Sequence, residues 1–131
     1  MGKFLILAAV VLPMFFGCKN VKQNKEMFKS IDVEEFAKLI EDEDVQRLDV
    51  RTSDEYEEGH IENALLIDVL QDDYENRALE LLDKRRPVAL YCRSGNRSKK
   101  AAQILASNGY DVYELATGFR GWSAAGMAWS K

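Results

Sequence analysis

A short, nearly continuous apolar run at residues 87–91, with the sequence PVALY, constrains the fold more than any other segment. Polar side chains do not alternate with apolar ones here, as they do in strands with one face in water. The run therefore predicts a strand that is covered on both faces. Residues 92–97 lead from it into a segment of helical spacing that begins near Ser98 and ends at Asn108 and Gly109. A covered strand followed at once by a helix is typical of parallel α/β sheets.

The rest of the chain alternates strand and helix patterns in the same way. Asp32 predicts a helix start, because its side chain can accept hydrogen bonds from exposed backbone N–H groups while Glu35 reaches back. Strands are expected at residues 47–50, 64–69, 87–91 and 111–115, and helices after Asp32, across 74–82 and at 98–107. This order predicts an α/β domain with an open, mainly parallel sheet.

The N-terminal segment has a different composition. Lys3 precedes an uncharged run at residues 4–16, which as a helix would reach roughly 20 Å, short of the ~30 Å hydrocarbon core of a bilayer. The run is thus typical of a signal peptide, with a buried core helix as the alternative. It ends in Gly17-Cys18, which resembles the lipobox of bacterial lipoproteins, although Phe15 and Phe16 depart from the usual pattern.

This resemblance divides the chain into a signal peptide at residues 1–17, a lipidated polar tether at 18–27 and a folded domain at 28–131. Cys18 would carry the lipid and hold the protein on the periplasmic side of a bacterial cell envelope, at the inner or the outer membrane. The alternative is ordinary secretion, with Cys18 unmodified or removed.

Cys92 comes directly after the buried strand, at the carboxyl end where α/β folds place their ligand sites. The following loop can direct its N–H groups towards one point above a helix N-terminus, and Arg93 and Arg97 add positive charge. We therefore expect Cys92 to ionise readily and to act as a nucleophile near neutral pH. The expected substrate-binding residues are Arg93, Ser94, Gly95, Asn96, Arg97 and Ser98.

Structural roles are the alternatives for these residues. Cys92 could be a small buried core residue, and Arg93 and Arg97 a solvated helix start, although cations there oppose the helix dipole. Lys99 and Lys100 are interpreted as a solvated helix face.

Together with two other segments, the cysteine loop resembles the rhodanese family of sulfurtransferases. Residues 48–67 are similar to the segment before that family's active site, and residues 115–126 to its C-terminal segment. Thr117 departs from the pattern where the family usually has a glycine, and Ala128 where it often has a proline. The resemblance covers about residues 28–131 and implies a sheet of about five strands flanked by helices. The residues that carry it are Asp49, Val50, Arg51, Glu55, Tyr56, Gly59, His60, Ile61, Ala64, Gly118, Gly121, Trp122 and Gly126.

The resemblance also implies a mechanism. The Cys92 thiolate would take the outer sulfur of a donor such as thiosulfate and hold it as a persulfide until cyanide or a thiol removes it. Loop amides would stabilise the persulfide, Arg93 and Arg97 would attract the donor, and no metal or organic cofactor would be needed. Asp49 and Arg51 would support the site, with Asp49 nearest the pocket. Related phosphatases have a loop one residue longer, so this loop better fits a sulfur atom.

Other interpretations stay open at this stage. His60 could form a dyad with Cys92, although a structural role is favoured, and Trp122 and Trp129 are interpreted as packing residues. The alternative functions are a thiol redox or sulfur-carrier protein and a noncatalytic rhodanese-like binding module.

The net charge of −4 argues against nucleic-acid binding. With Cys18 assigned to lipid and Cys92 to chemistry, no structural disulfide is expected. The donor, the acceptor, any protein partner and the oligomeric state are not specified.

Overall fold

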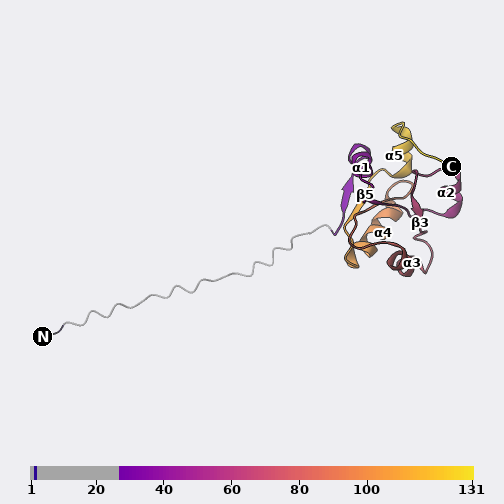
Figure 1. Ribbon diagram of the computed structural model, residues 1–131. Helices are drawn as coiled ribbons and strands as arrows, with labels where there is room; N and C mark the ends of the chain where they lie inside the picture. The colour runs from indigo at the N-terminus through magenta and orange to yellow at the C-terminus, as the bar shows by residue number, and fades with distance from the viewer. Residues whose placement is uncertain (1, 3–26) are drawn as a thin grey trace.

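The structure, a computed structural model, describes residue 2 and residues 27–131 (Figure 1). In this part of the chain the strands are β1 (Lys29–Ile31), β2 (Gln46–Asp49), β3 (Leu65–Leu66), β4 (Val88–Tyr91) and β5 (Val112–Leu115). The helices there are α1 (Val33–Leu39), α2 (Ser53–Glu58), α3 (Tyr74–Leu81), α4 (Asn96–Ser107) and α5 (Gly118–Ala124). The signal peptide and Cys18 fall outside the described residues, apart from Gly2, as does the tether up to residue 26.

The strands form one five-stranded sheet in the order β1-β5-β4-β2-β3, and every neighbouring pair is parallel. Helices flank the sheet, so the predicted α/β class is confirmed (Figure 1). Along the chain, β2 is followed by β3 at one edge of the sheet, and the chain then returns to β4 and continues in the opposite direction to β5. The carboxyl ends of β2 and β4 therefore meet where the strand order reverses, which is the usual ligand position in such sheets. No helix among the described residues is long and apolar enough to span a bilayer.

The predicted central strand is β4, and all four of its residues are fully buried. Val88 and Leu90 face a cluster that includes residues of α3 and α4, whereas Ala89 and Tyr91 face Phe36 of α1 and Trp122 of α5. Figure 1 shows α1 and α5 on one side of the sheet and α3 and α4 on the other. This two-sided cover explains why the segment contains no charged residue.

Several element boundaries differ from the predictions. The strand expected at residues 64–69 is only Leu65–Leu66, at the sheet edge, and no strand or helix was expected at β1, α2 or α5. The α2 helix begins with a capping box between Thr52 and Glu55, a signal present in the sequence. The α4 helix begins at Asn96 rather than near Ser98, because Gly95 is the N-cap residue and turns the chain at φ 104°.

The predicted helix start at Asp32 is confirmed, since its side chain accepts a hydrogen bond from the Glu35 N–H at 2.9 Å. Thr117 fits where a glycine was expected, because its backbone has an ordinary right-handed conformation and Gly121 leaves room beside its side chain. Ala128 contributes its carbonyl, which accepts the indole N–H of Trp122 at 2.9 Å. Neither departure disturbs the fold around the site.

Candidate active site

Cys92 lies directly after β4 with only 1% of its surface exposed. Its Sγ accepts a hydrogen bond from the Gly95 N–H at 3.1 Å and lies 3.4 Å from the Ser98 hydroxyl oxygen. Only glycine suits position 95, because its φ is 104° and a Cβ there would collide with the Ala116 carbonyl oxygen. The tight turn at Gly95 is what brings the loop back over the sulfur.

Burial raises the pKa of the Cys92 thiol, but hydrogen bonding with the Ser98 side chain and with backbone N–H groups outweighs this effect and holds the pKa below its ordinary value. The backbone groups belong to Ser98, Gly95 and Ser94. The loop therefore forms the expected cradle of amides around the sulfur, and a thiolate there is a competent nucleophile.

The first residues of α5 support this loop from the other side. The N–H of Phe119 donates to the Cys92 carbonyl at 2.8 Å, and that of Arg120 donates to the Arg93 carbonyl at 3.0 Å. Gly118 makes this approach possible, since a Cβ there would lie 2.5 Å from the Arg93 carbonyl carbon and oxygen. With its carbonyls bound behind it, the loop turns amides towards the sulfur.

Arg97 lies in the first turn of α4, and its guanidinium group forms a two-pronged ion pair with Glu55 of α2. The two N–O distances are 2.6 Å and 2.9 Å. This hydrogen bonding is the main reason why the pKa of Glu55 falls to about 2. The sequence assigned Arg97 to a donor anion, and in the structure the anion beside it is Glu55.

Arg93 instead is exposed beside a cavity of about 450 Å³ next to the loop. Arg120 of α5 also lines this cavity, and within the part of the chain that the structure describes neither guanidinium group has a carboxylate partner. Phe119 supplies an apolar wall. Glu55 and Glu58 also line the cavity, but Glu55 is paired with Arg97, so Arg93 and Arg120 leave the lining with an excess of positive charge that suits a small anion. Arg120 and Phe119 were not singled out from the sequence.

Asp49 and Arg51 form a buried ion pair beneath the cavity, with an Nη2–Oδ2 distance of 2.7 Å. Arg51 also donates to the Gly59 carbonyl at 2.7 Å, and the Tyr91 hydroxyl donates to Asp49 at 2.8 Å. Burial raises the pKa of Tyr91, so its hydroxyl keeps this proton. The framework role expected for the pair fits these contacts, but Arg51 and not Asp49 lines the cavity.

His60 and the two tryptophans have structural contacts. The His60 ring stacks on Tyr56 at 3.6 Å between centroids, and its Nδ1 lies 2.8 Å from the Tyr56 carbonyl oxygen. Trp122 is buried against Phe36, whereas Trp129 is partly exposed over Gly59 and Phe119. The Cys92 sulfur has its hydrogen-bonding partners in its own loop, Gly95 and Ser98 among them, and His60 is not one of those found among the described residues.

Sequence reasoning missed Glu114, a fully buried carboxylate on β5. Its oxygens accept hydrogen bonds from Ser98 at 2.5 Å, from Lys99 at 2.9 Å and from Ser30. Lys99 and Lys100 are both exposed, as the interpretation of a solvated helix face expected, but Lys99 also forms an ion pair with Glu114. A charged residue inside the apolar strand pattern of residues 111–115 was the available signal.

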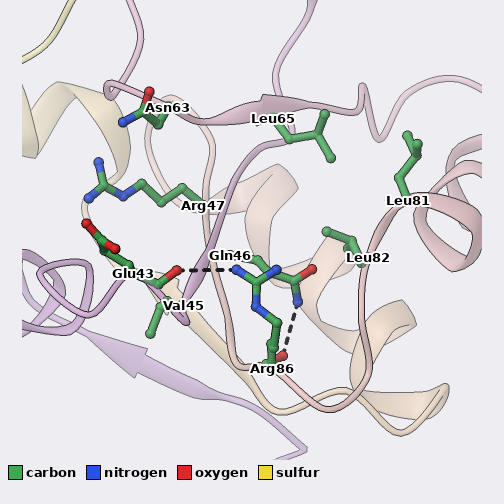
Figure 2. Close-up of a pocket in the computed structure, with 9 residues that line it drawn as sticks. All are labelled: Glu43, Val45, Gln46, Arg47, Asn63, Leu65, Leu81, Leu82 and Arg86. Carbon is green, nitrogen blue, oxygen red and sulfur yellow. Dashed lines mark hydrogen bonds between the residues drawn. The ribbon is translucent and has the colours of Figure 1, made fainter.

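A second cavity, of about 360 Å³, lies at the opposite, amino-terminal ends of β2 and β4 (Figure 2). Its polar side chains serve the fold, because Arg47 donates to the carbonyls of Glu62 and Ile40 and Arg86 donates to those of Asp44 and Glu43. It contains no nucleophile. The described residues hold no cluster of three or more His, Cys, Asp or Glu side chains that could bind a metal ion.

Comparisons with known proteins agree with the fold. A family model described as the Rhodanese-like domain matches residues 32–125. Thiosulfate sulfurtransferase GlpE from Coxiella burnetii (strain RSA 331 / Henzerling II) is 39% identical over 100 residues, which are 75% of this chain and 90% of that protein. The crystal structure of a rhodanese-like domain protein from Staphylococcus aureus superimposes with a TM-score of 0.64 at 35% identity, and covers 72% of this chain and 91% of that one.

A further relative is described as a putative sulfur carrier protein, YrkF from Bacillus subtilis (strain 168). It is 31% identical over 109 residues, which are 82% of this chain and 57% of that protein.

Proposed function

The chain belongs to the rhodanese-like domain family, as a sulfurtransferase, and from this membership we propose that it moves sulfane sulfur through a persulfide on Cys92. The donor is an anion such as thiosulfate, and the acceptor is cyanide or a thiol. The observation that carries the proposal is the buried Cys92 sulfur within a ring of backbone N–H groups, which lower the pKa of its thiol against the effect of burial. Such a site stabilises negative charge on sulfur before and after transfer.

In the first step the Cys92 thiolate attacks the outer sulfur of thiosulfate. A new S–S bond forms at Cys92, the bond to the central sulfur breaks, and sulfite leaves with the electron pair. The Gly95 N–H, 3.1 Å from Sγ, belongs to the group of amides that hold the resulting charge. In the second step the acceptor attacks the outer sulfur and the Cys92 thiolate is regenerated.

The cavity beside the loop is the proposed place of the donor's anionic end. Arg93 and Arg120 face it without a carboxylate partner among the described residues, whereas the charge of Arg97 is balanced by Glu55. Arginine is suited to this role because its planar group binds an oxyanion through two hydrogen bonds.

The decisive experiment is mass spectrometry of the protein after incubation with thiosulfate. We expect the Cys92 peptide to gain one sulfur and cyanide then to release it as thiocyanate, while Cys92→Ser gains none. A folded wild-type protein that takes up no sulfur from thiosulfate or other sulfane donors contradicts the proposal. Rapid alkylation of Cys92 near neutral pH is a second expected result, and reaction only above about pH 8.5 contradicts the activated thiolate.

The donor cavity has its own test. Arg93→Ala and Arg120→Ala each remove a cation from the cavity, so we expect the KM for thiosulfate to rise about three- to tenfold with little change in kcat. Lys100→Ala removes an exposed cation of α4 that does not line the cavity and is the matched control. If all three variants raised the KM for thiosulfate equally, donor binding would depend only on the overall positive charge of this face and not on the cavity.

A sulfur-carrier function is the second candidate, favoured by the similarity to YrkF. It uses the same persulfide and differs in the acceptor. A carrier releases its sulfur to a partner protein's thiol and turns over slowly with cyanide, so the ratio of these two rates separates the candidates. A noncatalytic binding module is disfavoured, because such a module needs no activated thiol.

A further inference from the structure

Persulfide chemistry leaves one buried charged group beside the thiol without a role. Glu114 is 0% exposed in a strand whose other residues are Val112, Tyr113 and Leu115. Removing a carboxylate from water is costly unless hydrogen bonds replace its hydration. Glu114 has such bonds, since Ser98 donates to one of its oxygens and Lys99 and Ser30 donate to the other.

Ser98 connects this carboxylate to the thiol. Its hydroxyl oxygen lies 2.5 Å from Glu114 Oε2 and 3.4 Å from Cys92 Sγ. A serine hydroxyl has one proton and can also accept hydrogen bonds. When Ser98 donates to the Glu114 carboxylate, its oxygen can accept the Cys92 S–H. When Ser98 donates to a Cys92 thiolate, Glu114 must carry a proton and donate it to Ser98.

We propose that Cys92, Ser98 and Glu114 form a proton relay, in which Glu114 takes the thiol proton through Ser98. The Cys92 S–H bond breaks and its proton forms a new O–H bond on Ser98. The original Ser98 O–H bond breaks at the same time and its proton binds Glu114 Oε2. One negative charge moves from carboxylate to sulfur, so atoms, electrons and net charge balance without any co-reactant.

Burial makes an internal acceptor useful. Cys92 is 1% exposed, and Ser98 and Glu114 are 0% exposed, so the thiol proton has no direct contact with bulk water. A proton that passes from Cys92 to Glu114 stays in the protein interior, so the site keeps one negative charge while the sulfur becomes ionised.

The charged groups that face the relay come from α4. The Lys99 ammonium group forms an ion pair with Glu114. The Arg97 guanidinium group is paired with Glu55 and also interacts electrostatically with Cys92. From β1 the neighbour is the neutral Ser30 hydroxyl. One cation therefore lies near each end of the relay and favours negative charge on Glu114 or on Cys92. Glu114 touches no substrate, so it is a positioning residue that acts through Ser98.

The relay predicts a distinct pH dependence for the reaction of Cys92 with iodoacetamide. A lone thiol loses about tenfold in thiolate for each pH unit below its pKa. A thiol that shares a proton with Glu114 keeps a constant thiolate fraction over this range, until the pair binds a second proton. The alkylation rate of the wild type should therefore reach a plateau at pH values below the pH range in which the thiol titrates. The rate is measured on the full chain by mass spectrometry of the Cys92 peptide.

Two variants break the relay and one serves as the control. Glu114→Gln keeps the size of the side chain but cannot take the proton, and Ser98→Ala removes the bridge. In both, the rate should fall about tenfold per pH unit without a plateau. Ser30→Ala removes a donor to the same carboxylate but leaves the path through Ser98 intact, so its plateau should remain. Circular dichroism and thermal melts establish that each variant is folded.

Three results would overturn the relay. The first is a wild-type profile without a plateau, and the second is a plateau of wild-type height in folded Glu114→Gln or Ser98→Ala. The third is loss of the plateau in Ser30→Ala as well, which would mean that Glu114 has only a structural role. The inference rests on the proposed function only in taking Cys92 as the reacting thiol. Alkylation needs no sulfur donor, so failure of sulfur uptake and failure of the relay are read separately.

Discussion

At the scale of single residues, contacts separate arginines that look alike in the sequence. Arg51 is paired with Asp49 and Arg97 with Glu55, whereas Arg93 and the later Arg120 face the cavity. An arginine that already forms a two-pronged ion pair has fewer donors left for a ligand. Of the two arginines in this loop, Arg97 is therefore held in an ion pair within the fold, whereas Arg93 lines the cavity.

The Glu55–Arg97 pair predicts a pH-dependent loss of stability. The pKa of Glu55 is lowered from 4.5 to about 2, chiefly by its hydrogen bonds with Arg97, so the pair stabilises the folded state fully above about pH 4.5. The contribution disappears as the pH falls towards about 2. Glu55→Gln should lower the free energy of unfolding by about 1–3 kcal/mol at neutral pH. Glutamine also suits the capping box, so α2 keeps its start.

Urea unfolding between neutral pH and about pH 2 measures this effect. The difference between wild type and Glu55→Gln should shrink across the acid range, since the wild type loses the same pair when Glu55 is protonated. Glu57→Gln, at an exposed position of the same helix, is the control. A difference that does not change with pH would rule out the ion pair as its cause.

At the scale of elements, the site is the junction of β4, α4 and α5. The junction depends on Gly95, which turns the chain into α4 and donates its N–H to the Cys92 sulfur. The amino end of α5 holds the outer carbonyls of the same loop.

Replacement of Gly95 by alanine should damage both stability and chemistry. The left-handed φ alone costs about 1–2 kcal/mol for a residue with a Cβ, and the new Cβ would also clash with the Ala116 carbonyl. Gly109→Ala separates the two effects, because Gly109 has φ 90° and a Cβ added there would have no atom within 4 Å. We expect thermal melts to show a larger loss for Gly95→Ala, and alkylation of Cys92 to slow only in that variant. Equal losses of melting temperature in Gly95→Ala and Gly109→Ala would mean that the loop relieves the clash at Gly95 without a cost in free energy.

The buried Asp49–Arg51 pair joins the end of β2 to β4 and to the end of α2. Asp49→Asn preserves size but leaves the Arg51 charge buried and uncompensated, so we expect a loss of about 3–5 kcal/mol in unfolding free energy. Asp83→Asn is the control, because its pair with Arg85 lies at the surface, and its melting temperature should stay close to wild type. A small loss for Asp49→Asn would show that Tyr91 and the Gly59 carbonyl suffice to hold Arg51.

At the scale of the whole molecule, the acidic net charge of −4 conceals a local excess of positive charge at the cavity, where Arg93 and Arg120 outweigh the carboxylate of Glu58, which is unpaired among the described residues. Charge summed over a chain does not report where cations gather, and a small donor responds to the local field.

We also propose that residues 1–17 direct export and that Cys18 carries a lipid, on the basis of the sequence pattern. Each buried CH₂ of an acyl chain contributes about 0.8 kcal/mol to membrane binding. Cys18→Ser should therefore release the protein into the soluble periplasmic fraction of a bacterial host, with sulfur transfer retained. Membrane partition that does not change in this variant would refute the anchor.

Local patterns predicted a large part of the fold. The buried run at β4, the Asp32 cap and the stop after α4 were predictable, since each depends on residues a few positions apart. The three-residue strand β1 and the short helix α5 were not, because so few residues carry no periodicity. Their existence depends on neighbours supplied by the rest of the fold.

The sequence by itself determined that a cysteine follows a buried strand and opens a tight loop before a helix. The tertiary structure decided the partners of that loop, with Arg97 bound to Glu55, the Asp49–Arg51 pair bound to Tyr91, and Ser98 bound to Glu114. The physical reason is distance along the chain. These partners come from strands and helices that only the strand order and register bring together, whereas the strand, the loop and the helix N-terminus form from adjacent residues.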